Sequence, residues 1–167
     1  SPASLPEFEL HYRSTPGDEL AQAFDELLKR PEITFTHAQG NIHCPENGHI
    51  LMIAGGTGAS VAFSIGHQRL PSSEPTTVLW CAAQNSEIYA SEELAQLVTE
   101  LKVFVDKRRT EKNAGLAWLA NNAHPEHHQH VIISGSPGFV YAVTDLLIGK
   151  GFMPSALQSD VYEYAPR

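Results

Sequence analysis

The sequence lacks a long apolar run and a basic excess, and each absence excludes a class of partner. Its apolar stretches, such as residues 50–54, are far shorter than the roughly 20 residues that a membrane-spanning helix needs. The formal charge of -8 and the isoelectric point of about 5.5 give a surface that repels phosphate backbones and anionic lipids. We therefore expect neither a membrane nor a nucleic acid as partner.

Cysteine is also scarce. Cys44 and Cys81 have no CxxC spacing and no histidine pair at the intervals of a zinc site. We interpret both as reduced thiols and predict a cytoplasmic protein. The stretch His124–His130 is rich in imidazoles, the commonest ligands of transition metals. Its irregular spacing around a proline favours a solvated loop over a metal site, so we expect no bound metal.

The first 48 residues form a short unit of their own. Alternation of apolar and polar residues over 7–12 predicts a strand, and apolar residues at helical spacing predict a helix from Leu20 that stops at Pro31. Residues 33–36 predict a second strand. Turn-forming residues then follow up to Gly48 and indicate a domain junction. We expect a β/α unit over 1–48 and a second domain over 49–167.

From His49 onward, short apolar strands alternate with helices. We expect strands at 49–54, 76–81, 101–105, 131–134 and 158–164, and helices at 59–69, 91–100, 114–121 and 138–149. Strands that are apolar throughout and separated by helices are typical of a parallel sheet with right-handed crossovers. The predicted fold class is α/β, with a doubly wound parallel sheet.

The first strand of this domain runs into a glycine-rich turn, Gly55–Ser60, that opens a helix. Glycine lets the backbone approach a ligand closely, and the free amides of a helix N-terminus attract a pyrophosphate. The turn is neither a Walker loop nor a GxGxxG fingerprint. It is either a phosphate cradle or a tight strand-to-helix connection that binds nothing. If it is a cradle, valine at Gly56 or Gly58 should abolish dinucleotide binding and leave the fold largely intact.

A second turn of small residues, Ser134–Gly138, follows the fourth strand. Ligands of an open parallel sheet bind outside the carboxyl ends of its strands, so the two turns can face one dinucleotide. On local grounds the favoured alternative is a serine cap followed by proline at the first helical position.

Together these motifs resemble the nucleotide-binding domain of the ferredoxin-NADP reductase superfamily. The resemblance rests on residues 54–58 after an apolar strand and on 134–137 before a helix. Residues 58–62 look more like the NAD(P)H:flavin reductase branch. Residues 79–84, with Ile88-Tyr89 and Glu93-Leu94 beyond them, are similar to the part of the family that receives the adenosine side.

This resemblance implies an enzyme that transfers hydride from NAD(P)H to FMN, FAD or riboflavin. Ser134 would be the catalytic residue, beside the nicotinamide. The remaining residues that the resemblance assigns to cofactor binding are Gly55, Gly56, Thr57, Gly58, Ala59, Ser60, Gln84, Gly135, Ser136, Pro137, Ser1 and Tyr164.

Residues 1–48 resemble the last part of the family's flavin-binding barrel, with Ser1 as the serine that ends its Arg-x-Tyr/Phe-Ser motif. The isolated chain is therefore expected to be inactive or weakly active. Two alternatives stay open: a reductase component that passes electrons to an acceptor protein, and a non-enzymatic dinucleotide-binding module.

Several positions leave open which dinucleotide is preferred and which residues contact the cofactor rings. Gln84 stands where relatives often carry an arginine, so the choice between NADH and NADPH is undecided. Arg108 and Arg109 either reach a 2'-phosphate or belong to a solvated loop. Tyr162 and Tyr164 either cover a flavin or nicotinamide ring, or pack in a last strand.

Overall fold

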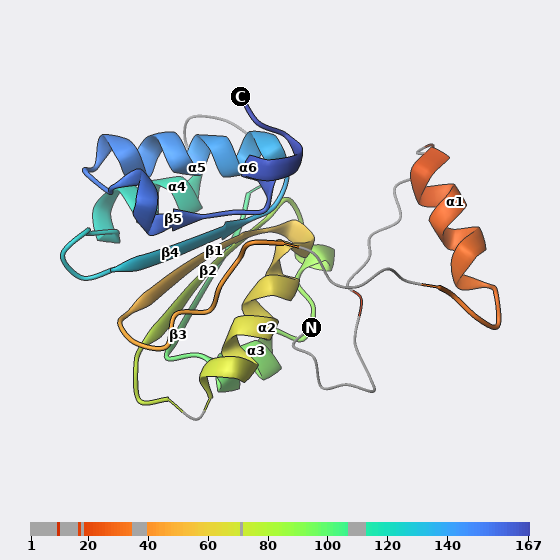
Figure 1. Cartoon of the computed structure of the whole chain (residues 1–167), viewed down its shortest axis with the longest axis horizontal. Coiled ribbons are helices and arrows are strands. Elements are labelled where there is room, and N and C mark those ends of the chain that lie inside the picture. The colour runs from red at the N-terminus through yellow and green to blue at the C-terminus, as the bar shows by residue number, and fades with distance from the viewer. Residues whose placement is uncertain (1–9, 11–16, 18, 35–39, 71, 107–112) are drawn as a thin grey trace.

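The computed structural model describes residues 10, 17, 19–34, 40–70, 72–106 and 113–167. Its centre is one parallel sheet with the strand order β3-β2-β1-β4-β5 (Figure 1). The strands are β1 (Ile50–Gly55), β2 (Thr76–Ala82), β3 (Glu100–Val105), β4 (His130–Ser134) and β5 (Leu157–Gln158). The predicted α/β fold with a parallel sheet is confirmed.

Helices cover both faces of the sheet (Figure 1). One face carries α2 (Ala59–Arg69) and α3 (Ser91–Leu97), and the other carries α4 (Ala114–Asn122), α5 (Pro137–Gly149) and α6 (Val161–Tyr164). Within the described residues there are also three single-turn 3-10 helices, η1 (Gly56–Gly58), η2 (Asn85–Glu87) and η3 (Pro154–Ala156).

The central strands are apolar on both faces because each face has its own core. Ile50 and Met52 of β1 pack on the α2 side, whereas Leu51 and Ile53 pack on the side of α4 and α5. All four side chains are fully buried, and burial of each contributes about 2 kcal/mol. The sheet is therefore anchored at β1, which is also the strand that leads into the glycine-rich turn.

The order of the strands creates a switch point beside β1. The chain first winds outward through β2 and β3, then crosses over through α4 and enters β4 on the other side of β1. The turns that follow β1 and β4 consequently leave the sheet toward opposite faces, and a crevice opens between them at the carboxyl edge.

The last predicted strand is wrong over most of its length. Residues 158–164 contribute only Gln158 to β5, and the chain then forms α6. The backbone N–H groups of Glu163 and Ala165 donate to the carbonyls of Asp160 and Val161, which is a helical pattern. Because Val161 is fully buried against the α5 side of the sheet, one helical turn buries it as well as a strand would.

The N-terminal part agrees in its helix. The predicted helix is present as α1 (Glu19–Leu28), which Figure 1 shows to one side of the α/β body. Ile33 and Thr34 are outside any strand, and the rest of the predicted strand 33–36 lies outside the described residues, as does most of the strand 7–12. The division at residue 48 stays a prediction. Within the described part of the chain, no helix is long and apolar enough to cross a membrane.

Candidate dinucleotide-binding site

The glycine-rich turn has the backbone shape of an anion cradle. Gly55 ends β1 in an extended conformation, and Gly56 has φ +56°, in the left-handed region that favours glycine. Helical structure then starts at η1 and continues into α2. Neither Gly55 nor Gly58 can cap these helix starts with a side chain, and the first N–H groups of a helix have no carbonyl partner within it. The turn therefore offers backbone amides to a ligand.

A buried tryptophan holds this turn in place. Trp80 of β2 donates from Nε1 to the carbonyl oxygen of Gly56 at 3.0 Å. Its indole is fully buried, and Tyr89 packs against it edge-on with 5.2 Å between ring centroids. Tyr89 in turn stacks on Phe63 of α2. The position of Gly56 is thus tied to the core beneath it.

Gly58 has a packing role that the sequence did not reveal. A Cβ atom at this position would lie 2.4 Å from the carbonyl oxygen of Ser134, so only glycine allows the turn after β1 to touch the end of β4. The expectation that valine at Gly58 leaves the fold intact is therefore wrong. At Gly56, in contrast, a Cβ atom would meet nothing within 4 Å. A substitution at Gly56 therefore tests the open space above the turn without disturbing the packing beneath it.

A cavity of about 270 Å³ opens above the turn, at the carboxyl ends of the first four strands. Its wall combines the two predicted turns with the ends of β2 and β3. The lining residues are Gly55, Gly56, Thr57, Cys81, Ala82, Ala83, Glu87, Asp106, Asn113, Ser136 and Phe139. Four of these were predicted from the sequence: Gly55, Gly56, Thr57 and Ser136.

Phe139 joins the two turns. A Cβ atom at Gly55 would lie 2.7 Å from its ring, and one at Gly135 would lie 3.0 Å from it. The phenyl ring therefore rests against two glycines, in the crevice between β1 and β4. Sequence reasoning missed this residue because an aromatic residue in the first turn of α5 has no signature of its own.

The other predicted residues lie close to the turns but not all line the cavity. Ser134 is buried at the end of β4, beside Gly58. Ala59 is buried and Ser60 is half-buried in the first turn of α2. Gln84 is exposed after β2 and is absent from the cavity wall.

The alternative for the second turn, a serine cap followed by proline at the first helical position, is confirmed only in part. Pro137 occupies the first helical position of α5, as that reading requires. Ser136 makes no side-chain capping hydrogen bond and lines the cavity instead. The amides at the start of α5 consequently have no serine cap.

Two carboxylates lie on the far side of the cavity, where the sequence had given no site. Asp106 follows β3, and its Oδ2 accepts a hydrogen bond from the Ala114 N–H at 2.9 Å. Glu87 accepts through Oε2 from the Ala83 N–H at 2.9 Å. Asp106 and Ala83 come directly after strand ends, and the rule that ligands bind beyond the carboxyl ends of parallel strands would have pointed to this edge.

Cys81 is a packing residue rather than a nucleophile. Burial, and to a smaller extent the nearby Asp106 carboxylate, raises the pKa of its thiol to about 12. A Cβ atom at Gly115 would lie 2.4 Å from its Sγ, so α4 packs directly on the sulfur. The thiol is therefore protonated and fills space beneath the cavity.

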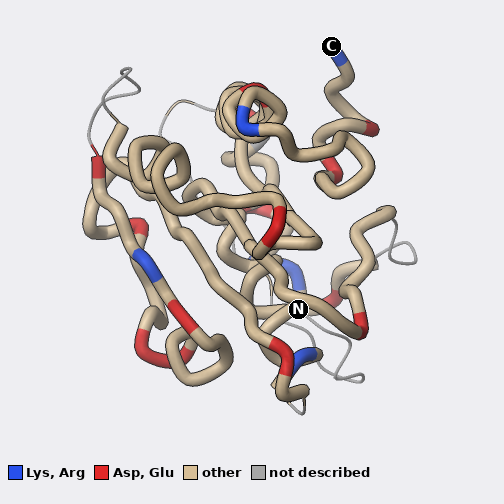
Figure 2. The backbone as a smooth tube through the Cα atoms, turned by 90° about the vertical axis from the view of Figure 1, so that its left-hand side faces the viewer, with Lys and Arg blue, Asp and Glu red and all other residues tan. Residues whose placement is uncertain are grey.

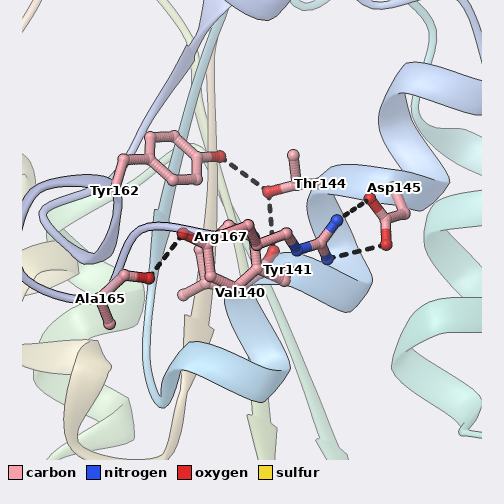
Figure 3. A network of polar contacts seen from close by, with 7 residues as sticks. All are labelled: Val140, Tyr141, Thr144, Asp145, Tyr162, Ala165 and Arg167. Atoms are coloured by element: carbon pink, nitrogen blue, oxygen red, sulfur yellow. Dashed lines mark hydrogen bonds and ion pairs between the residues drawn. The ribbon is translucent and has the colours of Figure 1, made fainter.

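The C-terminal tyrosines fasten α6 to α5 (Figure 3). The Tyr162 hydroxyl lies 2.7 Å from Thr144 Oγ1, and Tyr141 donates to the Ala165 carbonyl at 2.7 Å. Arg167 adds two hydrogen bonds to Asp145 and lies over the Tyr141 ring.

The two alternatives for the tyrosines were a cover over a cofactor ring and packing in a last strand. Tyr162 packs against the core, although it lies in a helix and not in a strand. Tyr164 is 63% exposed and does not line the cavity. Ser1, Arg108 and Arg109 lie outside the described residues.

The histidine-rich stretch forms contacts between rings. The rings of His124 and His127 meet edge-on, and the ring of His128 lies against that of His49. Among the residues that the structure describes, no three His, Cys, Asp or Glu side chains come together as a metal-binding group. Lys and Arg positions in that part of the chain are scattered and form no stripe along the face seen in Figure 2.

No protein-family model matches the sequence, and no curated protein matches it either. Solved structures do resemble it. A cytochrome P450 reductase from Amycolatopsis has a TM-score of 0.68 at 17% identity, over 90% of this chain and 50% of that one. The flavohem-like FAD/NAD-binding domain of a nitric oxide dioxygenase from Vibrio cholerae has a TM-score of 0.59 at 20% identity, over 73% and 54%.

A third structure, the C-terminal domain of a hydrogenase from Pyrococcus furiosus, has a TM-score of 0.57 at 18% identity and is covered over 97% of its length by 72% of this chain. The chain thus spans about half of the cytochrome P450 reductase and of the nitric oxide dioxygenase domain, and nearly all of the hydrogenase domain. Together with the strand order and the cavity, these likenesses show that the chain has the nucleotide-binding-domain fold of the ferredoxin-NADP reductase superfamily.

Proposed function

We propose that this chain binds NAD(P)H through its glycine-rich turn and serves as the nucleotide-binding part of a flavin-dependent oxidoreductase. The observation that carries the proposal is the place of the turn. It lies at the switch point of the sheet, it presents helix-start amides, and at Gly56 it faces open space beside the cavity. Amides and the positive end of a helix favour a pyrophosphate at this place.

In this proposal the residues of the chain position the dinucleotide. Gly55–Ser60 receive the pyrophosphate, Ser134–Pro137 line the nicotinamide pocket, and Gln84 lies toward the adenosine side. The nicotinamide supplies a hydride and a flavin accepts it, so no side chain has to act as a nucleophile. Ser134, buried beside Gly58, would then adjust the geometry of the nicotinamide without donating a proton.

The first candidate for the electron acceptor is a free flavin. In a flavin reductase, FMN, FAD or riboflavin would be reduced as a loosely held substrate. Residues 1–48 would then be the end of a flavin-binding barrel, with Ser1 and Tyr164 on the flavin side. The two free cysteines support a cytoplasmic location for such an enzyme.

A second candidate is a reductase component that passes electrons to an acceptor protein. It is favoured by the likeness to the Amycolatopsis cytochrome P450 reductase, which extends over 90% of this chain. Both candidates require the same dinucleotide site, so one binding experiment tests what they share.

The test is a Gly56→Asn variant. Asparagine tolerates the left-handed backbone better than other side chains, and its Cβ atom would enter the space proposed for the pyrophosphate. We expect the wild-type chain to bind NADH or NADPH in calorimetry, and the variant to lose at least roughly tenfold in affinity, about 1.4 kcal/mol.

Gly151→Asn is the matched control. Gly151 also has a positive φ, of +91°, with nothing within 4 Å of its Cβ position, but it lies in the turn after α5. It should carry a similar cost in stability and leave affinity unchanged. Equal dinucleotide affinity in wild type and a folded Gly56→Asn chain would remove the turn from the site.

A further inference from the structure

We propose that a second ligand site lies at the amino edge of the sheet and binds a small carboxylate through Arg69 and Thr76. The site is a cavity of about 170 Å³ between the end of α2, the start of β2 and the segment that joins α3 to β3. Because β2 has seven residues and a strand rises about 3.3 Å per residue, the site lies roughly 20 Å from the carboxyl edge. A ligand here would not touch a dinucleotide at the glycine-rich turn.

The cavity lies beside a close contact between two helices. A Cβ atom at Gly66 of α2 would lie 2.9 Å from the Cβ of Leu97, the last residue of α3. About one turn further along the chain, Arg69 and Leu70 line the cavity together with Leu97 and Val98. One water molecule needs only about 10–15 Å³ of such volume. The cavity is therefore large enough for a ligand of several atoms.

Two residues in the wall of the cavity are buried and have polar atoms without a partner. Arg69 is 4% exposed and Thr76 is 2% exposed. The two Nη atoms of Arg69 donate to the carbonyls of Pro45 and Gly48, and the backbone of Thr76 is bonded on both sides to Thr99. Within the described part of the chain, Arg69 Nε and the Thr76 hydroxyl have no hydrogen-bond partner. Buried polar groups are nearly always bonded, so these two donors indicate a ligand that accepts from them.

The charge of Arg69 favours an anion with a single negative charge. Among the residues that the structure describes, no carboxylate forms an ion pair with its guanidinium group, and a buried cation is unfavourable without a counter-charge. The other charged residue in the wall is Glu74, whose Oε2 accepts from the Gly48 N–H. One negative charge balances Arg69, whereas a second charge, as on phosphate, would be repelled by Glu74. A carboxylate also has two oxygens for the two free donors, and such charge-assisted bonds are strong.

The apolar residues of the wall fit a short alkyl chain. Leu70 is 59% exposed, and it lines the cavity with Leu97 and Val98. Exposed apolar surface next to a buried cation suits a molecule with a charged head and an apolar end, because covering that surface removes it from water. A carboxylate of a few carbons can bind its oxygens at Arg69 and Thr76 and cover Leu70 with its chain.

The test compares butyrate with butyramide, which has nearly the same shape and no charge. Titration of the full 167-residue chain, followed by two-dimensional amide NMR, should give at least roughly tenfold tighter binding of butyrate. The amide signals of Thr76, Val98 and Thr99 should shift, and those of Gly55–Ser60 should not. Inorganic phosphate, titrated in the same way, should bind more weakly than butyrate.

Thr76→Val removes the free hydroxyl and should weaken butyrate binding at least roughly fivefold. Thr77→Val is the matched control, because Thr77 lies on the opposite face of β2 and its hydroxyl contacts His49. It should leave butyrate affinity unchanged, and both variants should bind NADH as the wild type does. If Thr76→Val fails to fold, the wild-type affinities and the location of the shifted signals decide.

Three results would overturn the inference and leave the proposed function standing. They are equal binding of butyrate and butyramide, butyrate shifts confined to the glycine-rich turn, and unchanged butyrate affinity in a folded Thr76→Val chain. In each case the cavity would hold only water.

Discussion

At the scale of the residue, the glycines of the two turns have different structural roles. Gly56 has a left-handed backbone and faces open space, whereas Gly58 lies against the Ser134 carbonyl. Gly55 and Gly135 both leave room for the ring of Phe139. A glycine-rich sequence therefore combines a place for a ligand with a place where two strand ends meet, and only individual substitutions can separate the two.

The first prediction at this scale concerns Gly58→Ala. Its methyl group would lie 2.4 Å from a backbone oxygen, so the turn or the end of β4 has to shift. We expect a loss of about 1 to 3 kcal/mol in the free energy of unfolding, as for other overpacked sites. Urea denaturation followed by circular dichroism measures it.

Gly138→Ala serves as its control, because a Cβ atom there meets nothing within 4 Å inside α5. Replacing a helical glycine by alanine should leave stability unchanged or raise it by up to about 1 kcal/mol. If both variants unfold at the same urea concentration as the wild type, the close approach of Gly58 to Ser134 does not exist in solution.

At the scale of the element, the two edges of the sheet differ in chemistry. The carboxyl edge carries the cavity, and the amino edge carries a polar cluster around the start of β1. There, His49 Nε2 lies 2.9 Å from Thr77 Oγ1, and the His49 and His128 rings are 4.6 Å apart. Arg69, at the end of α2, donates to the carbonyls of Pro45 and Gly48. These bonds connect the chain before β1 to the sheet.

The second prediction concerns acid at this edge. Burial lowers the pKa of His49, and the neighbouring His128 lowers it further; burial also lowers the pKa of His128. The unfolded chain, with imidazole pKa values of about 6.5, then binds more protons than the folded one. The contribution to stability is complete above that pH and is lost as the pH falls through the lower folded values.

Urea midpoints at pH 7.5 and pH 5 should therefore differ, with the lower midpoint in acid. The variant with His49→Gln and His128→Asn keeps polar atoms near the positions of Nε2 and Nδ1 but cannot titrate, and its midpoint should change less over this range. An equal fall in the variant and the wild type would assign the acid sensitivity to other groups.

At the scale of the whole molecule, the chain spans about half of two of the longer structures that it resembles. Hydride transfer between two rings requires them to be held about 3 to 3.5 Å apart. The cavity lies among strands and helices of the nucleotide-binding fold, and in the proposed function a separate barrel would hold the flavin. We therefore expect the isolated chain to bind NAD(P)H but to reduce a flavin only slowly.

The third prediction follows from that division. The isolated chain should oxidise NADH slowly when FMN, FAD or riboflavin is added, and the same chain preceded by a flavin-binding barrel should do so at least roughly a hundredfold faster, because the barrel removes the entropy cost of bringing the rings together. Stopped-flow absorbance of NADH measures both rates. Comparable rates would place the flavin site within these residues.

The local pattern of apolar residues was enough to predict the strands and the helix that form the core. The apolar runs at β1 and β2 and the helical spacing of α2 predicted these elements within a residue of their bounds, because burial on both faces demands apolar side chains throughout. Residues 158–164 escaped this logic, since a short apolar segment at the edge of a sheet buries Val161 equally well in one helical turn.

For the site, the sequence by itself determined the two turns of small residues and their place after parallel strands, because glycine, serine and proline act on the backbone at their own positions. Only the tertiary structure decided that Gly58 packs while Gly56 stays open, and that Asp106, Glu87 and Phe139 share one cavity. Phe139 and Asp106 follow different strands and are far apart in the chain. Their meeting depends on the order and register of the strands, which emerge only when the whole sheet has formed.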